Sequence, residues 1–275
     1  VFTLTLIASS LSAYAQSTDV QNIDDADAST HDIERILVSG DFREITLDQL
    51  SASATILNQA RLSSRQPSHI DSVLNSVPNV NFSAGASRGR FIQIRGIGER
   101  SQFAEPINPS VSFIVDEFDF SGLAAAGLIF DTQQLDVYRG PQATLYGTGA
   151  LAGAVKLSSN KVGSESPKYV EARLGSKDSY RVEAAAGDDI NTDWGYRVAL
   201  VHNRSDGFVE NTYLNRDDTN NIDETAMRLS VEGNADERTT LAFTYRWYDI
   251  DNGYDAFSLD NDNKTLSDEP GFDEH

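Results

Sequence analysis

The second half of the chain alternates apolar and polar residues with a period of two. Five runs show this pattern: 170–174, 180–186, 194–200, 227–231 and 241–247. A period of two is the spacing of a β-strand with two unlike faces. Aromatic residues lie near the ends of several runs, and each run is close to the ~9–11 residues that a tilted membrane strand needs. A water-soluble β-sandwich alternates in the same way, so the pattern alone leaves both environments open.

The lengths of the connections favour the membrane. Asp188–Asp193 and Asn234–Thr239 are short. Asn203–Glu224 and the acidic stretch from Asp249 onward are long. Long loops that alternate with short turns are typical of an outer-membrane barrel, although Gly175–Ser179 is a short connection on the long-loop side. Nowhere does the sequence approach the ~20 consecutive apolar residues of a membrane helix, so a membrane-spanning form of this chain would cross as strands.

The composition excludes several classes of function. A formal net charge of −20 argues against a nucleic-acid partner, because an acidic surface repels phosphate. The chain has no cysteine, which excludes disulfides and thiolate metal sites, and its four histidines are scattered. We therefore expect no metal and no cofactor. The 275 residues, 39% of them hydrophobic, are enough for one or two folded domains.

The N-terminus has features of an export signal. Residues 2–8 are apolar but too short to cross a bilayer, and Ala13-Tyr14-Ala15 fits a small-residue cleavage site. Residues 1–15 are therefore predicted to be the end of a secretory signal peptide whose initiator Met and basic region are missing. An apolar tail that frays is the alternative. Residues 16–32 are polar and are predicted to be a flexible linker.

Between the linker and the alternating runs, the pattern is that of a small mixed α/β domain. Residues 135–138 predict a strand that Arg139-Gly140-Pro141 ends, and a run of small residues then turns the chain. Further strands are predicted at 53–58, 91–96, 109–117 and 154–157. One amphipathic helix is predicted from apolar residues at i, i+3, i+4 and i+7, before Pro78: Ile70, Val73, Leu74 and Val77.

Residues 131–147 resemble the plug-domain signature of TonB-dependent outer-membrane receptors. The signature positions are Gly140, Pro141, Tyr146 and Gly147, and Gly96 closes a similar Ile-x-Ile-Arg-Gly element. Another similar element is Pro109–Glu117, although Glu117 stands where the family usually has Gly, and Thr148–Gly153 also departs from the usual lettering. The resemblance implies an α+β plug domain over residues 41–162. It implies that residues 163–275 are the opening antiparallel strands, about five, of a transmembrane β-barrel that this chain leaves incomplete.

A short β-prone segment in front of the plug resembles a TonB box. An extended segment of this kind can add as a strand to the edge of a partner's sheet. The box would lie within the linker region 16–40, and the alternative is that it forms the first strand of the plug. The residues expected to contact TonB are Ile33, Glu34, Arg35, Ile36, Leu37 and Val38.

The resemblance also implies a role for Arg95 and Arg139, which both precede a glycine at a strand end. In this family, plug arginines at such positions are thought to pair with glutamates of the barrel wall and to seat the plug. Those glutamates would lie beyond residue 275. The alternative for each arginine is a solvent-exposed place at a strand end.

The function implied by the resemblance is active uptake of a scarce extracellular solute, such as a ferric siderophore complex, across the outer membrane. Energy would come from the inner-membrane complex through TonB, and the receptor would be a monomer in outer-membrane lipid without enzymatic activity. A secreted or surface β-rich adhesion protein without transport is the alternative from a different class.

Overall fold

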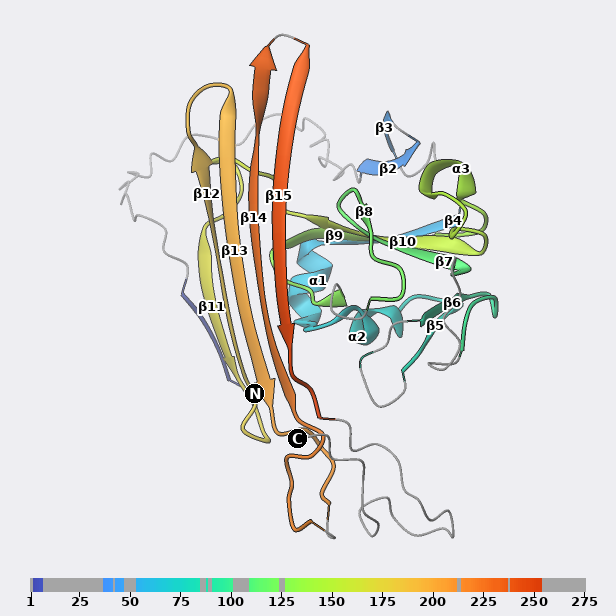
Figure 1. Ribbon diagram of the computed structural model, residues 1–275, viewed down its shortest axis with the longest axis vertical. Helices are drawn as coiled ribbons and strands as arrows, with labels where there is room; N and C mark the ends of the chain where they lie inside the picture. Colours follow the sequence, from blue (N-terminus) through green and yellow to red (C-terminus); the bar gives the residue numbers. More distant parts are fainter. Residues whose placement is uncertain are drawn as a thin grey trace, which may run out of the picture.

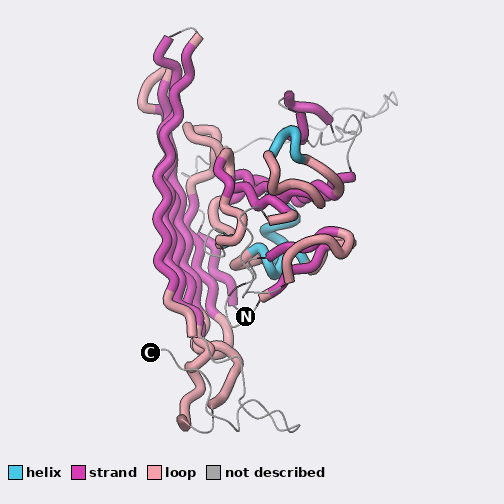
Figure 2. Tube along the Cα trace, turned by 45° about the vertical axis from the view of Figure 1, so that its right-hand side comes forward, coloured by secondary structure: helices cyan, strands magenta, loops and turns pink. Residues whose placement is uncertain are grey.

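The computed structural model describes residues 2–6, 37–41, 43–46, 53–84, 88, 91–100, 109–123, 127–211, 214–236 and 238–253. Two main sheets organise them, a five-stranded sheet with helices packed on it and a long six-stranded sheet beside it (Figure 1). We call them the plug sheet and the wall sheet. Figure 2 shows the wall sheet curving along one flank of the smaller elements.

The plug sheet is mixed and has the strand order β4-β9-β10-β7-β8. β9 pairs antiparallel with both β4 and β10, whereas β10 pairs parallel with β7. The strands predicted near positions 53, 111, 135 and 154 are therefore present. Their bounds are Ser53–Asn58 for β4, Val111–Val115 for β7, Phe118–Asp119 for β8, Thr132–Arg139 for β9 and Gly153–Ser159 for β10.

Helices and a small hairpin complete the plug. The predicted amphipathic helix is α2, Ile70–Leu74, which is shorter than its apolar pattern because Val77 lies in the turn that follows. The hairpin pairs β5, Val80–Ser83, with β6, Phe91–Ile94. Two helices were not predicted: α1, Gln59–Arg65, capped by the Asn58 side chain, and α3, Ala143–Tyr146, inside the small-residue run.

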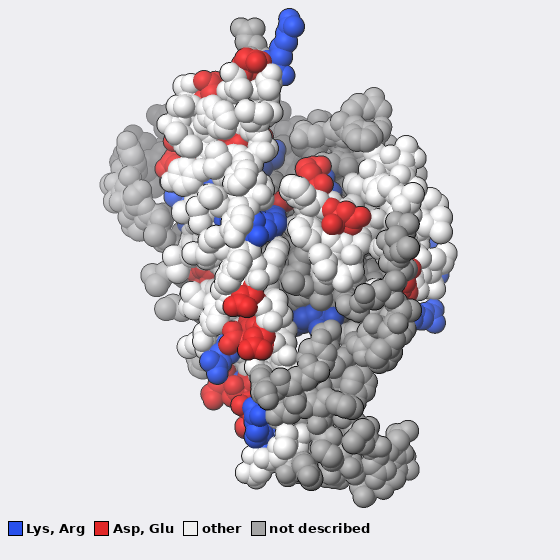
Figure 3. All heavy atoms as spheres, in the orientation of Figure 1, with Lys and Arg blue, Asp and Glu red and all other residues white. Residues whose placement is uncertain are grey.

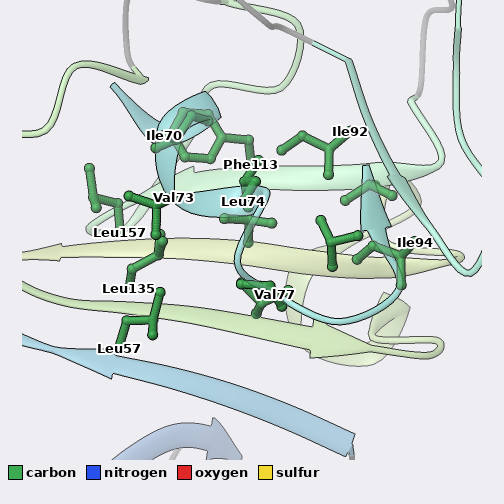
Figure 4. Close-up of a cluster of buried hydrophobic side chains, with 14 of the residues drawn as sticks. Leu57, Ile70, Val73, Leu74, Val77, Ile92, Ile94, Phe113, Leu135 and Leu157 are labelled. Atoms are coloured by element: carbon green, nitrogen blue, oxygen red, sulfur yellow. The ribbon is translucent and has the colours of Figure 1, made fainter. Parts of the chain in front are cut away.

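Apolar side chains fill the space between the plug sheet and α2 (Figure 4). Leu135 and Val137 of β9 are fully buried there against Val73 and Leu74 of α2. The opposite face of the sheet carries a smaller cluster: Ile56, Ile114, Tyr138, Ala150 and Ala154. Because a strand alternates its side chains, β9 contributes to both layers.

The N-terminal part contributes three short strands. β1, Phe2–Leu6, pairs antiparallel with β11 at the edge of the wall sheet. β2, Leu37–Asp41, pairs with β3, Arg43–Thr46. The predicted cleavage site lies outside the described residues, and the signal peptide and the linker remain predictions.

The wall sheet contains all five predicted alternating runs. Each strand pairs antiparallel with the next along the chain. The bounds are Tyr169–Leu174 for β11, Tyr180–Asp189 for β12, Trp194–Ser205 for β13, Ile222–Asp236 for β14 and Thr239–Ile250 for β15. The described strands form an open sheet and not a closed barrel, with β1 and β15 at its two edges.

The wall sheet buries its polar face against the plug and exposes its apolar face, which is the opposite of a water-soluble protein. On β13, Arg197 and Ala199 are fully buried against the plug, whereas Leu200 is 46% exposed. Phe243 and Trp247 of β15 are also exposed, and Figure 3 shows much uncharged surface over the upper part of the wall sheet. A sandwich buries its apolar face, so this arrangement is that of strands whose outer solvent is lipid.

No helix in the described part of the chain is both long and apolar enough to cross a bilayer.

Leu135, in the core of the plug, allows a direct test of how the plug is packed. Leu135→Ala removes a fully buried side chain, and we expect the free energy of plug unfolding to fall by about 2–5 kcal/mol. Urea unfolding of the plug in the full-length protein measures it. Leu151→Ala is the control, because Leu151 is 63% exposed and its loss should leave stability nearly unchanged. Equal effects of the two changes would contradict the core described here.

Candidate functional site

The junction between plug and wall is built around the carboxylate of Asp131. This residue lies in the loop that leads into β9, and its side chain is fully buried. The Arg197 guanidinium binds it with both ends, Nε to Oδ2 at 2.7 Å and Nη2 to Oδ1 at 2.5 Å. Arg228 of the next wall strand donates to Oδ2 of the same carboxylate. One plug carboxylate is thus shared between two wall arginines.

Asp131 has a left-handed backbone conformation, and its other polar groups are also hydrogen-bonded. Its φ is 46°, a left-handed value that aspartate tolerates better than most residues. The Asn160 side chain donates to Oδ1 at 2.8 Å, and the Asp131 amide donates to Oε1 of Glu183 in the wall at 2.8 Å. Every polar group of Asp131 is therefore used, which a buried charge requires.

Beside it lies a second set of wall side chains that reach the plug backbone. Glu183 also accepts from the Tyr169 hydroxyl at 2.5 Å and from Arg181 Nη2 at 2.7 Å. Arg181 in turn donates to the carbonyl oxygen of Ile129 at 2.5 Å. The segment that precedes β9 is thus held by both main-chain and side-chain bonds.

Asp116 makes a similar contact one strand further along the wall. It follows β7, has a φ of 56°, and its carboxylate accepts from Arg246 of β15 and, at 2.8 Å, from the Ser159 amide. Arg246 and Arg228 are cross-strand partners in the wall. Two like charges placed opposite each other destabilise a sheet, and the plug carboxylates offset this repulsion. The residue with positive φ in this turn is Asp116. It precedes Glu117, the position at which the family usually has Gly.

A third ion pair lies at the end of the wall where the long connection joins β13 to β14. Arg88 of the plug donates to both carboxylate oxygens of Glu224, at 2.7 and 2.8 Å. Asn203 and Asn252 donate to the same carboxylate, at 3.0 and 2.9 Å. On its other side Arg88 is 3.9 Å from the Asp71 carboxylate at the start of α2.

Small residues of the wall leave room for the plug segment between these pairs. Leu128 and Phe130 pack on alanines of three adjacent strands, Ala185, Ala199 and Ala226, all buried. Larger side chains there would push the plug away from the arginines. The junction therefore combines close apolar packing with buried ion pairs, and this combination fixes the plug in one position.

The junction joins the plug to the wall through ion pairs and hydrogen bonds. Three carboxylates face four wall arginines, and several guanidinium nitrogens have no hydrogen-bond partner among the described residues. No cluster of three or more metal-ligating side chains occurs in the described ranges.

Comparison with known proteins identifies the architecture. Residues 46–154 match the family model of the TonB-dependent receptor plug domain. This match and the relatives below support a fragment of a TonB-dependent outer-membrane receptor. Its place is therefore the outer membrane, and its wall sheet is the first part of a receptor barrel.

Individual relatives agree with this assignment. The pesticin receptor of Yersinia pestis is 27% identical over 170 residues, which cover 61% of this chain and 25% of that protein. The vitamin B12 transporter BtuB of Photobacterium profundum is 23% identical over 233 residues, 84% of this chain and 37% of the relative. The crystal structure of the ferric yersiniabactin uptake receptor FyuA from Yersinia pestis superposes with a TM-score of 0.61, at 24% identity, over 70% of this chain and 30% of that one. The chain thus spans about a quarter to a third of these proteins.

The predicted seating arginines of the receptor lie away from the wall carboxylates that the structure describes. Arg139, at the end of β9, donates to Ser53 Oγ, to the Ala54 carbonyl and to the Pro78 carbonyl, all within the plug. Arg95 is exposed and has a φ of 54°. Pairing of either arginine with a glutamate beyond residue 275 stays a prediction.

The signature residues surround the end of β9. Gly140 has a φ of 121° and its amide donates to the Ala152 carbonyl at 2.9 Å. Pro141 follows, Tyr146 ends α3, and Gly147 caps that helix. Gly96 stands apart from this group, in the turn after β6, with a φ of 81°. Of the predicted TonB box, Leu37 and Val38 open β2 and the other residues lie outside the described ranges.

Sequence reasoning missed the residues that carry the junction. Arg197, Arg228 and Arg246 were recognised only as the polar face of alternating strands. Asp116 and Asp131 stand at strand ends of the signature elements, where an acidic residue suits a turn as well as a salt bridge. One sequence feature could have indicated the three arginines: each lies within a predicted membrane strand. A charge at that depth needs a buried partner.

A buried carboxyl on the other face of the plug sheet is sensitive to pH. Asp136 of β9 is 1% exposed, accepts from Gln134 at 2.7 Å, and has Lys156 as its cross-strand neighbour on β10. Burial raises the pKa of Asp136 to about 6, and the Gln134 hydrogen bond and the Lys156 charge reduce this rise only in part. The same burial raises the pKa of Tyr146 to about 12.

Asp131→Asn should loosen the plug strongly. The change keeps the size of the side chain but leaves Arg197 and Arg228 buried without a counter-charge, which costs about 3–5 kcal/mol. Urea extraction of the plug from the assembled receptor measures the loss. The matched control is Asp188→Asn, which breaks the solvent-exposed pair with Lys168 and should have no measurable effect. Extraction at the wild-type urea concentration would show that the junction does not hold the plug.

Asp136→Asn should stabilise the plug at neutral pH. A carboxyl whose folded pKa is about 6 in place of 3.8 destabilises the fold once it ionises, by about 3 kcal/mol above pH 6 and by nothing below pH 4. The variant should therefore unfold at higher urea than wild type at pH 8 and at similar urea at pH 4. A gain of the same size at both pH values would show that ionisation of Asp136 is not the cause.

Proposed function

We propose that this protein is a TonB-dependent transporter that takes up a scarce extracellular solute across the outer membrane. The observation that supports this most is the buried, ion-paired docking of a small α/β domain on the polar face of a sheet whose other face is apolar. A plug held in this way closes a pore and can be moved by force from one side.

Energy would enter through residues 33–38, the predicted TonB box, by addition of this segment as a strand to the TonB sheet. Residues 1–15 would be removed on export and residues 16–40 would act as the tether. The receptor would act as a monomer in outer-membrane lipid. No covalent chemistry is needed for this cycle.

The solute we favour is a ferric siderophore complex. The similar structures include a ferric yersiniabactin uptake receptor, and this supports an iron complex. Relatives named as vitamin B12 transporters make cobalamin the second candidate. Uptake of iron-55 siderophore complexes and of labelled cobalamin by cells that express the full-length receptor distinguishes the two.

Ile36→Pro tests the route of energy. Proline removes a backbone donor from any strand that the box adds to TonB. Solute should still bind to the cells while energy-dependent uptake stops. The control is Thr18→Pro, which places the same residue in the polar linker and should leave uptake unchanged. Uptake by the Ile36 variant at the wild-type rate would place the TonB contact elsewhere.

A further inference from the structure

After the tether and the β2–β3 hairpin, the chain enters the plug sheet at Ser53, the first residue of β4. Among the described strands, β4 lies at the edge of the plug sheet and pairs with β9 alone. The pairing is antiparallel and starts with Ser53 opposite Arg139 and Ala54 opposite Tyr138. A pull on the N-terminal segment would therefore load the pair of Ser53 and Arg139 before any other pair of the sheet.

The Arg139 guanidinium fastens this first pair. Its Nε donates to Ser53 Oγ at 3.2 Å, and its Nη2 donates to the Ala54 carbonyl at 3.3 Å. Its Nη1 donates to the carbonyl of Pro78, after α2, at 3.1 Å. Three acceptors from two separate segments thus converge on one side chain. A planar guanidinium has the several fixed donors that this requires, and a lysine has not.

The two ends of β9 are held in different ways. Before its first residue, Asp131 binds two wall arginines in a fully buried ion pair. At its last residue, Arg139 holds β4 by hydrogen bonds that are exposed or only partly buried. Water competes for exposed bonds more easily than for buried charged ones. The contact at Arg139 should therefore yield first, so that β4 leaves β9 while β9 stays on the wall.

We propose that Arg139 is a positioning residue that sets the force at which β4 detaches from β9. This inference rests on the proposed function, in which TonB pulls on the tether. In this role Arg139 acts between two parts of the plug and needs no glutamate of the barrel. Loss of its hydrogen bonds lets an energised pull open the plug too easily, without changing the resting seal.

Arg139→Gln in the full-length receptor tests the role. Cells that express it are challenged with vancomycin, which is too bulky for ordinary porins, in strains with and without functional TonB. We expect sensitivity to rise on the order of tenfold, the factor for hydrogen bonds worth about 1.4 kcal/mol, only where TonB works. Adding Ile36→Pro should cancel the rise. Sensitivity that rises equally without TonB would overturn the proposal and favour seating against the wall, and unchanged sensitivity would overturn it as well.

Matched variants keep the result specific. Ser53→Ala removes one of the three acceptors and should give a smaller rise, whereas Arg65→Gln changes an exposed arginine at the end of α1 and should give none. Arg139→Lys, which keeps the charge, should lie between wild type and Arg139→Gln. Protease resistance of the plug in intact outer membranes confirms that each variant is assembled.

A mechanical measurement separates this inference from the proposed function. Single receptors in lipid are pulled from a handle at the N-terminus, and the first rupture should need less force in Arg139→Gln than in wild type. This result does not depend on TonB being the natural motor or on the solute. Equal first-rupture forces would overturn the role of Arg139 even if uptake proves TonB-dependent.

Discussion

The structure depends on a buried carboxylate shared between two arginines. Asp131 brings a negative charge to the polar face of the wall, where Arg197 and Arg228 would otherwise be buried alone. Removing charges from water is costly unless they are paired and hydrogen-bonded, and Asp131 supplies a carboxylate partner for both guanidinium groups. The wall and the plug therefore depend on each other: the wall presents charges that only the docked plug neutralises, and the plug loop adopts its left-handed turn to reach them.

The inversion of the wall sheet follows from its surroundings. Lipid takes the apolar face, so the polar face must find its partners inside the protein. The described plug provides them at Asp131 and Asp116, with small alanines leaving space for Leu128 and Phe130 between the arginine contacts. The docked domain is thus fixed in position by polar contacts and by an apolar cluster that crosses from the plug to the wall.

Strong local patterns made the secondary structure readable. The five alternating runs became β11–β15, and the apolar spacing from Ile70 became α2, because period and burial agree in each. α1 and α3 were not predicted because both are short and lack an apolar pattern. α1 has seven residues and one buried side chain, and α3 has four residues and none. Arg139 was correctly placed at a strand end, yet its partners Ser53 and Pro78 are remote in sequence and come together only through the pairing of β4 with β9 and the turn after α2.

The sequence by itself determined the alternating strands of the wall and the resemblance of the plug to a known family, because periodicity and signature residues are local properties of the chain. The tertiary structure decided which charges meet. Asp131 could have been an ordinary turn residue, and Arg197, 66 positions later, an ordinary polar residue of a strand. Only the docking of one sheet on the other brings them within hydrogen-bond distance, because a salt bridge between distant segments depends on register and packing and leaves no periodic trace in the sequence.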